Sequence, residues 1–156
     1  MVGIDLGERR IGVSVSDSHR VLATPHSVIR RSGDLSADHR VIAALVSELA
    51  AGLVVVGLPL NMAGDRGPAA SAAAAEASML ATELEVPVLL HDERLTTVEA
   101  DRRRRLAQDA GGDVGGKRAR RQARPTAAFR ASRVGIDAVA ATVLLQSWLD
   151  QKRGES

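Results

Sequence analysis

The chain has 156 residues, of which 45% are hydrophobic and 26% charged, so we expect one folded domain over residues 1–156 rather than a disordered chain. It contains no cysteine, which excludes disulfides and thiolate zinc sites. Its longest apolar stretch, residues 49–60, is far shorter than the ~20 residues of a membrane span. We therefore expect a cytoplasmic protein. The net charge is only +2, yet 19 of the 21 basic residues are arginine, which favours a polyanionic partner unless an arginine-rich genome alone explains the composition.

The first 30 residues predict three strands. Residues 2–6 and 11–16 are rich in β-branched side chains, and the four residues between them, 7–10, fit the loop of a hairpin. Residues 21–29 form a third such run, but they include Pro25, which cannot donate a hydrogen bond within a central strand. We therefore expect an antiparallel meander with the third strand at the edge of the sheet.

A first helix is predicted from a cap at Asp34 or Ser36 to about Ala51, where Gly52 would end it. The side chains expected on its buried face are Val41, Leu45, Val46 and Leu49. Helices and apolar strands alternate beyond it, which is typical of parallel strands joined by crossovers.

The elements expected in this second part are a strand at 53–58, an alanine-rich helix at about 67–84, a strand at 86–91, a helix from the capping box at Thr96 through Leu106, and a last helix at about 132–150. The predicted fold class is α/β, with a mixed five-stranded sheet in the order β-β-β-α-β-α-β-α-α and helices on both faces.

Residues 109–132 form a Gly/Arg-rich segment that we expect to be a flexible insertion. It contains four glycines and a dense basic run from Lys117 to Arg124, and little in it could contribute to a core. A solvated linker and a contact with a polyanion beside the functional site both remain open. With Phe129 and Trp148 as the only aromatic residues, any nucleic acid should be recognised through its backbone and shape rather than by base stacking.

Three carboxylates are expected where strands end or a helix packs on them. Asp5 lies in an apolar strand, where an ionised side chain needs a partner or a cation, although it could belong to the hairpin turn. Glu93 follows the strand at 86–91, at the edge where open α/β sheets bind ligands, although Asp92 and Glu93 could simply be charges at a helix terminus. His91 is more typical of a strand end than of a metal ligand.

Asp137 is the most informative of the three acids, because it shares a helix stripe with the apolar residues Ala140, Ala141, Leu144 and Leu145. The small residues around it would let the helix approach the strand that carries Asp5. The alternative is an aspartate favoured by the dipole of the first helical turn. Three carboxylates without cysteine or a histidine pair suit Mg²⁺ or Mn²⁺, and two such ions can hydrolyse a phosphodiester without a protein nucleophile.

Several strings of the sequence together resemble the YqgF/RuvX family of Holliday-junction-resolvase-like, pre-16S rRNA processing nucleases with an RNase H-like fold. They are Gly3-Ile4-Asp5-Leu6-Gly7, Arg10-Ile11-Gly12-Val13-Ser14, Gly57-Leu58-Pro59-Leu60-Asn61, Asp92-Glu93-Arg94-Leu95-Thr96-Thr97, Asp137-Ala138-Val139-Ala140-Ala141 and Leu145-Gln146-Ser147-Trp148-Leu149. The resemblance covers nearly the whole chain. It implies that Asp5, Glu93 and Asp137 are the catalytic carboxylates and metal ligands.

The leading hypothesis is a metal-dependent endonuclease that acts on structured nucleic acid, with the 5′ end of pre-16S rRNA as the favoured substrate and the small ribosomal subunit as a partner. The arginines expected to contact phosphates are Arg9, Arg94, Arg118, Arg120, Arg121 and Arg124. A resolvase of four-way DNA is the rival within the same chemistry, and it would favour a homodimer. Two hypotheses from different classes also stay open: a nucleotide-binding protein of the actin and sugar-kinase type, for which the chain is short, and a non-catalytic ribosome-assembly factor.

Overall fold

The computed structural model describes residues 1–61, 63–92, 94 and 135–155. In chain order its elements are β1 (Val2–Leu6), β2 (Arg10–Ser16), β3 (Ala23–Arg30), α1 (Leu35–Glu48), β4 (Val54–Leu58), α2 (Pro68–Glu83), β5 (Val88–Asp92) and α4 (Gly135–Gly154). The helix predicted at 96–106 and the Gly/Arg-rich segment at 109–132 lie outside the described residues. None of the described helices combines the length and the apolar character that crossing a membrane requires.

The five strands form one mixed sheet in the order β3-β2-β1-β4-β5. β1, β2 and β3 pair antiparallel, whereas β4 pairs parallel with both β1 and β5. The predicted meander, the parallel second part and the edge position of the Pro25 strand are therefore confirmed.

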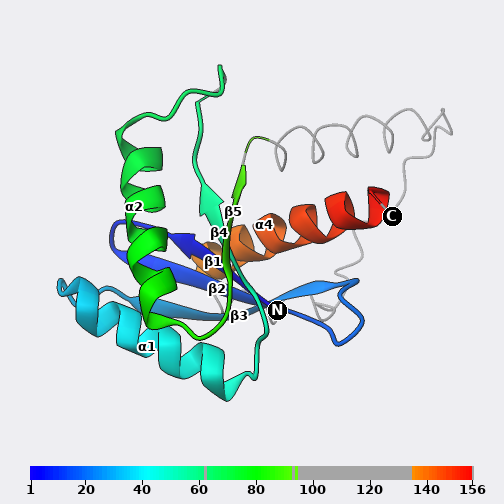
Figure 1. Cartoon of the computed structure of the whole chain (residues 1–156), viewed down its shortest axis with the longest axis horizontal. Helices are drawn as coiled ribbons and strands as arrows, with labels where there is room; N and C mark the ends of the chain where they lie inside the picture. The colour runs from blue at the N-terminus through cyan, green and yellow to red at the C-terminus, as the bar shows by residue number, and fades with distance from the viewer. Residues whose placement is uncertain (62, 93, 95–134, 156) are drawn as a thin grey trace, which may run out of the picture.

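The helices cover both faces of the sheet, as predicted (Figure 1). On one face, Ile4 and Ile11 of the strands pack with Ile42 of α1 and Leu80 of α2 in the larger core cluster. On the other face, Leu145 of α4 belongs to a smaller cluster with β4. Because successive side chains of a strand point to opposite faces, Gly3, Asp5, Gly12 and Ser14 lie on the α4 face.

The end predicted for the first helix was wrong. The helix ends at Glu48 with Leu49 as its cap, and Ala50 adopts a left-handed conformation with φ 47°. The amides of Ala50 and Ala51 then donate to the carbonyls of the last turn, which is the Schellman arrangement and stops the helix before Gly52.

The face predicted for this helix was also wrong at Val41, whose side chain is exposed. The buried stripe runs instead through His39, Ile42 and Val46, at intervals of three and four residues, with Asp38 beside it. Two polar residues therefore replace part of the apolar face that the sequence favoured.

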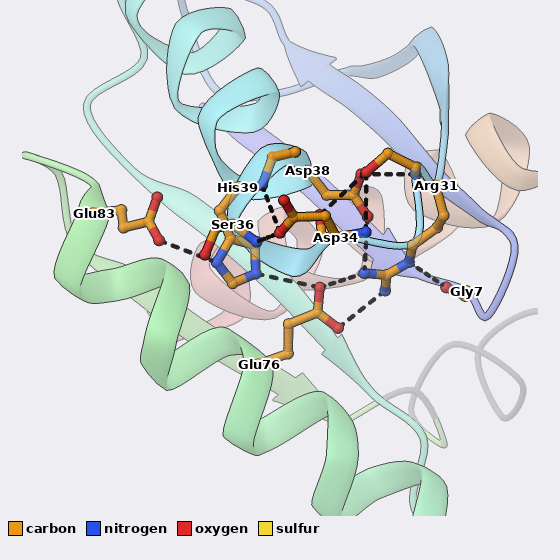
Figure 2. A network of polar contacts seen from close by, with 10 residues as sticks. Gly7, Arg31, Asp34, Ser36, Asp38, His39, Glu76 and Glu83 are labelled. Carbon is orange, nitrogen blue, oxygen red and sulfur yellow. Dashed lines mark hydrogen bonds and ion pairs between the residues drawn. The ribbon is translucent and has the colours of Figure 1, made fainter.

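These polar residues belong to a charged network between the two helices on that face (Figure 2). Arg31 donates to both carboxylate oxygens of Glu76, at 2.6 and 3.0 Å, and through Nε to the carbonyl of Gly7 at 2.9 Å. His39 also contacts Glu76, with Nε2 of the imidazole 3.4 Å from Oε1 of the carboxylate. The network ties the β1–β2 turn and the segment before α1 to α2, because one guanidinium reaches all of them.

Candidate active site

Asp5 lies near the end of β1, directly opposite Gly12 of β2, and its side chain is half-buried on the α4 face. Burial raises the pKa of this carboxyl, and the negative charge of nearby Asp137 raises it further. An acid in this position either takes up a proton or gains from a nearby cation, and the interpretation of Asp5 as a site residue stays a prediction.

Asp137 lies in the first turn of α4, directly over the strand pair that carries Asp5. A methyl group at Gly12 would overlap the backbone carbonyl of Asp137 and would lie 3.1 Å from the amide nitrogen of Ala138. The missing side chain at Gly12 therefore lets the helix rest on the strand. The predicted approach of Asp137 to Asp5 depends on this glycine as well as on the small residues of the helix.

Gly3 and Ser14 continue the same close contact along α4. The hydroxyl of Ser14 is completely buried and donates to the carbonyl of Ala141 at 2.8 Å. A methyl group at Gly3 would lie 2.7 Å from Cβ of Leu145. Small residues on the strands thus allow close contact with the helix at two successive turns, and this contact fixes the distance of Asp137 from the sheet.

The carboxylate of Asp137 makes an ion pair with Arg10, the first residue of β2. Arg10 Nε lies 3.0 Å from Oδ2 of Asp137, and 60% of the Arg10 side chain is exposed, against 24% for Asp137. Surface pairs of this kind contribute little to stability. Arg10 can therefore leave the carboxylate at small cost when another cation approaches.

Asp92 and Arg94 lie at the carboxyl end of β5. The guanidinium of Arg94 donates to both oxygens of Asp92, with a shortest distance of 2.6 Å, and it covers Gly64 in the loop after β4. The hydrogen bond from this side chain lowers the pKa of Asp92. Asp92 is therefore satisfied within the protein, which favours a structural role for it over metal binding.

Glu93, the third predicted ligand, lies outside the described residues, between Asp92 and Arg94. Across the part of the chain that the structure describes, no three acidic or histidine side chains gather closely enough to hold a metal ion. His91 is buried, with Nε2 3.1 Å from the hydroxyl of Ser147, and burial lowers its pKa. This agrees with its interpretation as a strand-end residue.

The donor set that the structure brings together fits a hard divalent cation. Asp5 and Asp137 supply carboxylate oxygens from two elements on one face, and a bound cation would offset both the burial and the repulsion from Asp137 that raise the pKa of Asp5. Glu93 would be the third ligand, as the resemblance implies. Mg²⁺ or Mn²⁺ suits these oxygens better than zinc does.

The arginines predicted to bind phosphate fall into three groups. Arg9 is exposed in the β1–β2 turn, one residue before Arg10. Arg94 is held by Asp92, as described above. The remaining four, Arg118, Arg120, Arg121 and Arg124, lie outside the described residues.

Sequence reasoning missed Arg10, Gly12 and Ser14 as determinants of the site. Gly12 and Ser14 stand in one of the strings that resemble the family, but neither carries an obvious chemical role. A signal was available, because alternation along the strand places both on the face of Asp5. Small residues on the face of an acid indicate that another element approaches closely there.

Comparison with known proteins gives consistent results. The RuvX family, described as "Holliday junction resolvase", matches residues 1–151. A "Putative pre-16S rRNA nuclease" of Mycobacterium sp. (strain KMS) is 46% identical over 153 residues, covering 97% of this chain and 80% of the relative. One of the same name from Leifsonia xyli subsp. xyli (strain CTCB07) is 41% identical over 155 residues, covering 99% of this chain and 88% of the relative.

Two solved structures share the fold. RuvC of T. thermophilus in complex with a Holliday junction substrate aligns with a TM-score of 0.58 and 16% identity, covering 99% of this chain and 96% of that one. A second Thermus thermophilus RuvC structure aligns with a TM-score of 0.54 and 17% identity, covering 98% and 95%. The fold is therefore RNase H-like, as predicted.

Proposed function

This chain belongs to the RuvX family, and from that premise we propose that it is a divalent-metal-dependent endonuclease that hydrolyses phosphodiester bonds of structured nucleic acid. The observation that carries the proposal is the placement of Asp5 and Asp137. Two carboxylates from separate elements lie on the α4 face, and the pKa of Asp5 is raised chiefly by burial and further by the negative charge of Asp137. Carboxyl groups whose pKa is perturbed in this way are frequent at functional sites, which supports the proposal.

Asp5, Asp137 and Glu93 are the proposed metal ligands and catalytic residues. Bound Mg²⁺ or Mn²⁺, as a pair of ions, would activate water and stabilise the leaving oxygen of the phosphodiester. The protein contributes the positions of the oxygens. Gly12 sets the separation of α4 from the strands, and the buried hydroxyl of Ser14 holds the helix in that place.

We propose pre-16S rRNA as the substrate, because relatives that are 41% and 46% identical over nearly the whole chain carry the name of a pre-16S rRNA nuclease. The expected site of cleavage is the 5′ end, and the small ribosomal subunit is the expected partner. The second candidate is a four-way DNA junction, which the description of the family favours. Resolution of a junction would further require a two-fold homodimer, since the substrate has that symmetry.

The proposal is tested by incubating the purified protein with labelled precursor 16S rRNA and with labelled four-way DNA junctions, in Mg²⁺, Mn²⁺ or chelator. Asp5→Asn, Glu93→Gln and Asp137→Asn are the test variants. Glu85→Gln is the matched control, because Glu85 is exposed and has no ion pair among the described residues. Sedimentation at several concentrations measures the oligomeric state in parallel.

We expect metal-dependent cleavage that the control retains and that Asp5→Asn and Asp137→Asn lose by at least ~10²-fold, since a two-ion site fails without its ligands. The substrate that is cut decides between the two candidates. If the wild-type protein binds both substrates but cuts neither in any metal, the enzyme hypothesis is wrong, and a non-catalytic assembly factor becomes the better explanation.

A further inference from the structure

An arginine-lined hollow of about 650 Å³ lies beside the candidate active site, between the β1–β2 turn and the segment that follows β3. Its lining consists chiefly of Arg9, Arg10, Arg30 and Arg31, with Glu8 and Ser32. Four guanidinium groups against one carboxylate give the hollow a strongly positive character. Asp137 and Glu76 neutralise two of the four, and the remaining excess of positive charge attracts anions.

The hollow adjoins the candidate active site through Arg10. Arg10 and Arg30 are directly opposite each other on β2 and β3, so their side chains lie on the same face of the sheet. That face also carries Asp5, and Arg10 Nε reaches Asp137 Oδ2 at 3.0 Å. The side chain of Arg10 would therefore separate an anion in the hollow from the carboxylate of Asp137.

The four arginines differ in their existing partners. Arg31 is bound to Glu76 on the α2 face, and Arg10 is paired with Asp137. Arg9 and Arg30 are exposed, and neither makes an ion pair or a side-chain hydrogen bond with the described residues. These two guanidinium groups are consequently available to a ligand, while those of Arg10 and Arg31 are engaged with Asp137 and Glu76.

Backbone contacts hold the turn that carries Arg9 against the end of β3. The amide of Arg31 donates to the carbonyl of Arg9 at 3.0 Å, which extends the β2–β3 ladder into the turn. Arg31 also binds the carbonyl of Gly7, so the turn that carries Arg9 is held from two sides. Arg9 and Arg30 line the same hollow, so their planar guanidinium groups can both turn toward one ligand with several acceptor oxygens.

We propose that this hollow binds a backbone phosphate of the substrate strand next to the scissile bond, with Arg9 and Arg30 as its phosphate ligands. The inference rests on the proposed function and names how the same site holds its substrate. Arginine forks match the paired oxygens of a phosphodiester, and the ion pair between the lining residue Arg10 and Asp137 places the hollow beside the candidate active site, which favours nucleic acid over an unrelated anion. Arg10 lies between the phosphate and the carboxylate and would keep the two negative groups apart.

The test measures binding without cleavage. A fluorescent four-way DNA junction and a fluorescent precursor rRNA are titrated with protein in chelator, at chloride concentrations from about 50 to about 200 mM, a range over which phosphate contacts change affinity strongly. The test variant is Arg9→Gln with Arg30→Gln. The control is Arg20→Gln with Arg40→Gln, which removes the same charge from exposed arginines outside the hollow.

We expect the test variant to bind about 10-fold more weakly, and its slope of log K against log salt to become shallower by about 0.7 to 0.9, the contribution of one phosphate. The control should keep the wild-type slope to within about 0.5. The affinity of the Arg9→Lys with Arg30→Lys variant should lie between those of the wild type and the test variant, because lysine keeps the charge of arginine but not its forked guanidinium.

Equal slopes for the wild type and the test variant would overturn the inference, and so would an equal loss in the control. Inorganic phosphate that displaces the labelled nucleic acid far better than chloride at the same ionic strength would assign the hollow to a free anion instead. Failure of the wild-type protein to bind either nucleic acid would refute the proposed function, so the two failures are distinguishable.

Discussion

Replacing Gly12 with alanine tests how far the site depends on the contact between α4 and the sheet. The new methyl carbon would lie well inside van der Waals distance of the Asp137 carbonyl and 3.1 Å from the Ala138 nitrogen. Both neighbours are backbone atoms of a helix, so no side-chain rotation can relieve the overlap. The helix must move by roughly 1 Å or more to restore ordinary contacts.

This overpacking should lower the free energy of unfolding by about 1 to 3 kcal/mol. The loss of the conformational freedom of glycine in the unfolded chain offsets about 0.5 to 1 kcal/mol of that. We therefore expect a net loss of about 1 to 2 kcal/mol in urea unfolding. Displacement of Asp137 by this distance should also reduce the cleavage rate by ~10²-fold, since catalytic geometry tolerates little misplacement.

Gly52→Ala is the matched control, because a methyl group at Gly52 meets no atom within 4 Å. Its free energy of unfolding should stay within about 0.5 kcal/mol of the wild type, and its cleavage rate should be unchanged. A Gly12→Ala protein with wild-type stability would refute the described seating of α4. A destabilised variant with the full cleavage rate would refute the link between that seating and the position of Asp137.

Two further predictions follow from charged groups. Burial and the charge of Asp137 raise the pKa of Asp5 above 3.8 in the folded protein. The stability linked to this carboxyl is therefore present at low pH, where the group is protonated, and is lost as the pH rises through the raised pKa. In chelator, Asp5→Asn should be more stable to urea than the wild type at pH 7, and this gain in stability should be smaller near pH 4. A variant equally or less stable at pH 7 would contradict this. Glu76→Gln should lower the free energy of unfolding by about 2 to 4 kcal/mol, because it leaves the guanidinium of Arg31, 13% exposed, with only one carboxylate, that of Asp38 at 3.8 Å. An effect as small as that of the exposed control Glu85→Gln in the same urea titration would show that the network contributes no stability.

The features that the sequence could predict are those in which a single residue departs from the pattern around it, such as a proline in a strand or an acid in an apolar run. Pro25 places its strand at the edge of the sheet, because it cannot donate to a second neighbour, and the structure confirms this. The acids Asp5 and Asp137 interrupt apolar patterns, so each could be identified without knowledge of its partner. The sequence could not reveal that a third residue, Arg10, neutralises one of them, because an arginine at the start of a strand breaks no pattern.

The end of α1 shows why boundaries are harder to predict. Glycine is the usual residue in the left-handed position after a helix, so Gly52 was the natural choice. The structure uses Ala50 instead, although this conformation costs alanine roughly 1 kcal/mol. Hydrogen bonds from the Ala50 and Ala51 amides to the last turn compensate, and burial of Ala51 in the larger core cluster adds to them. Tertiary packing outweighed local preference here, and no sequence pattern of α1 reports it.

The difference between local preference and tertiary packing also explains which face of α1 is buried. The sequence favours Val41 over His39 for the core on hydrophobicity alone, whereas the structure buries the histidine and exposes the valine. His39 is acceptable there because Glu76 of α2 lies within 3.4 Å and Glu83 within 3.5 Å of its ring nitrogens. A buried polar group is tolerated only with partners. Those partners belong to a helix far along the chain, so the cost of burying His39 becomes calculable only after the two helices have been placed side by side.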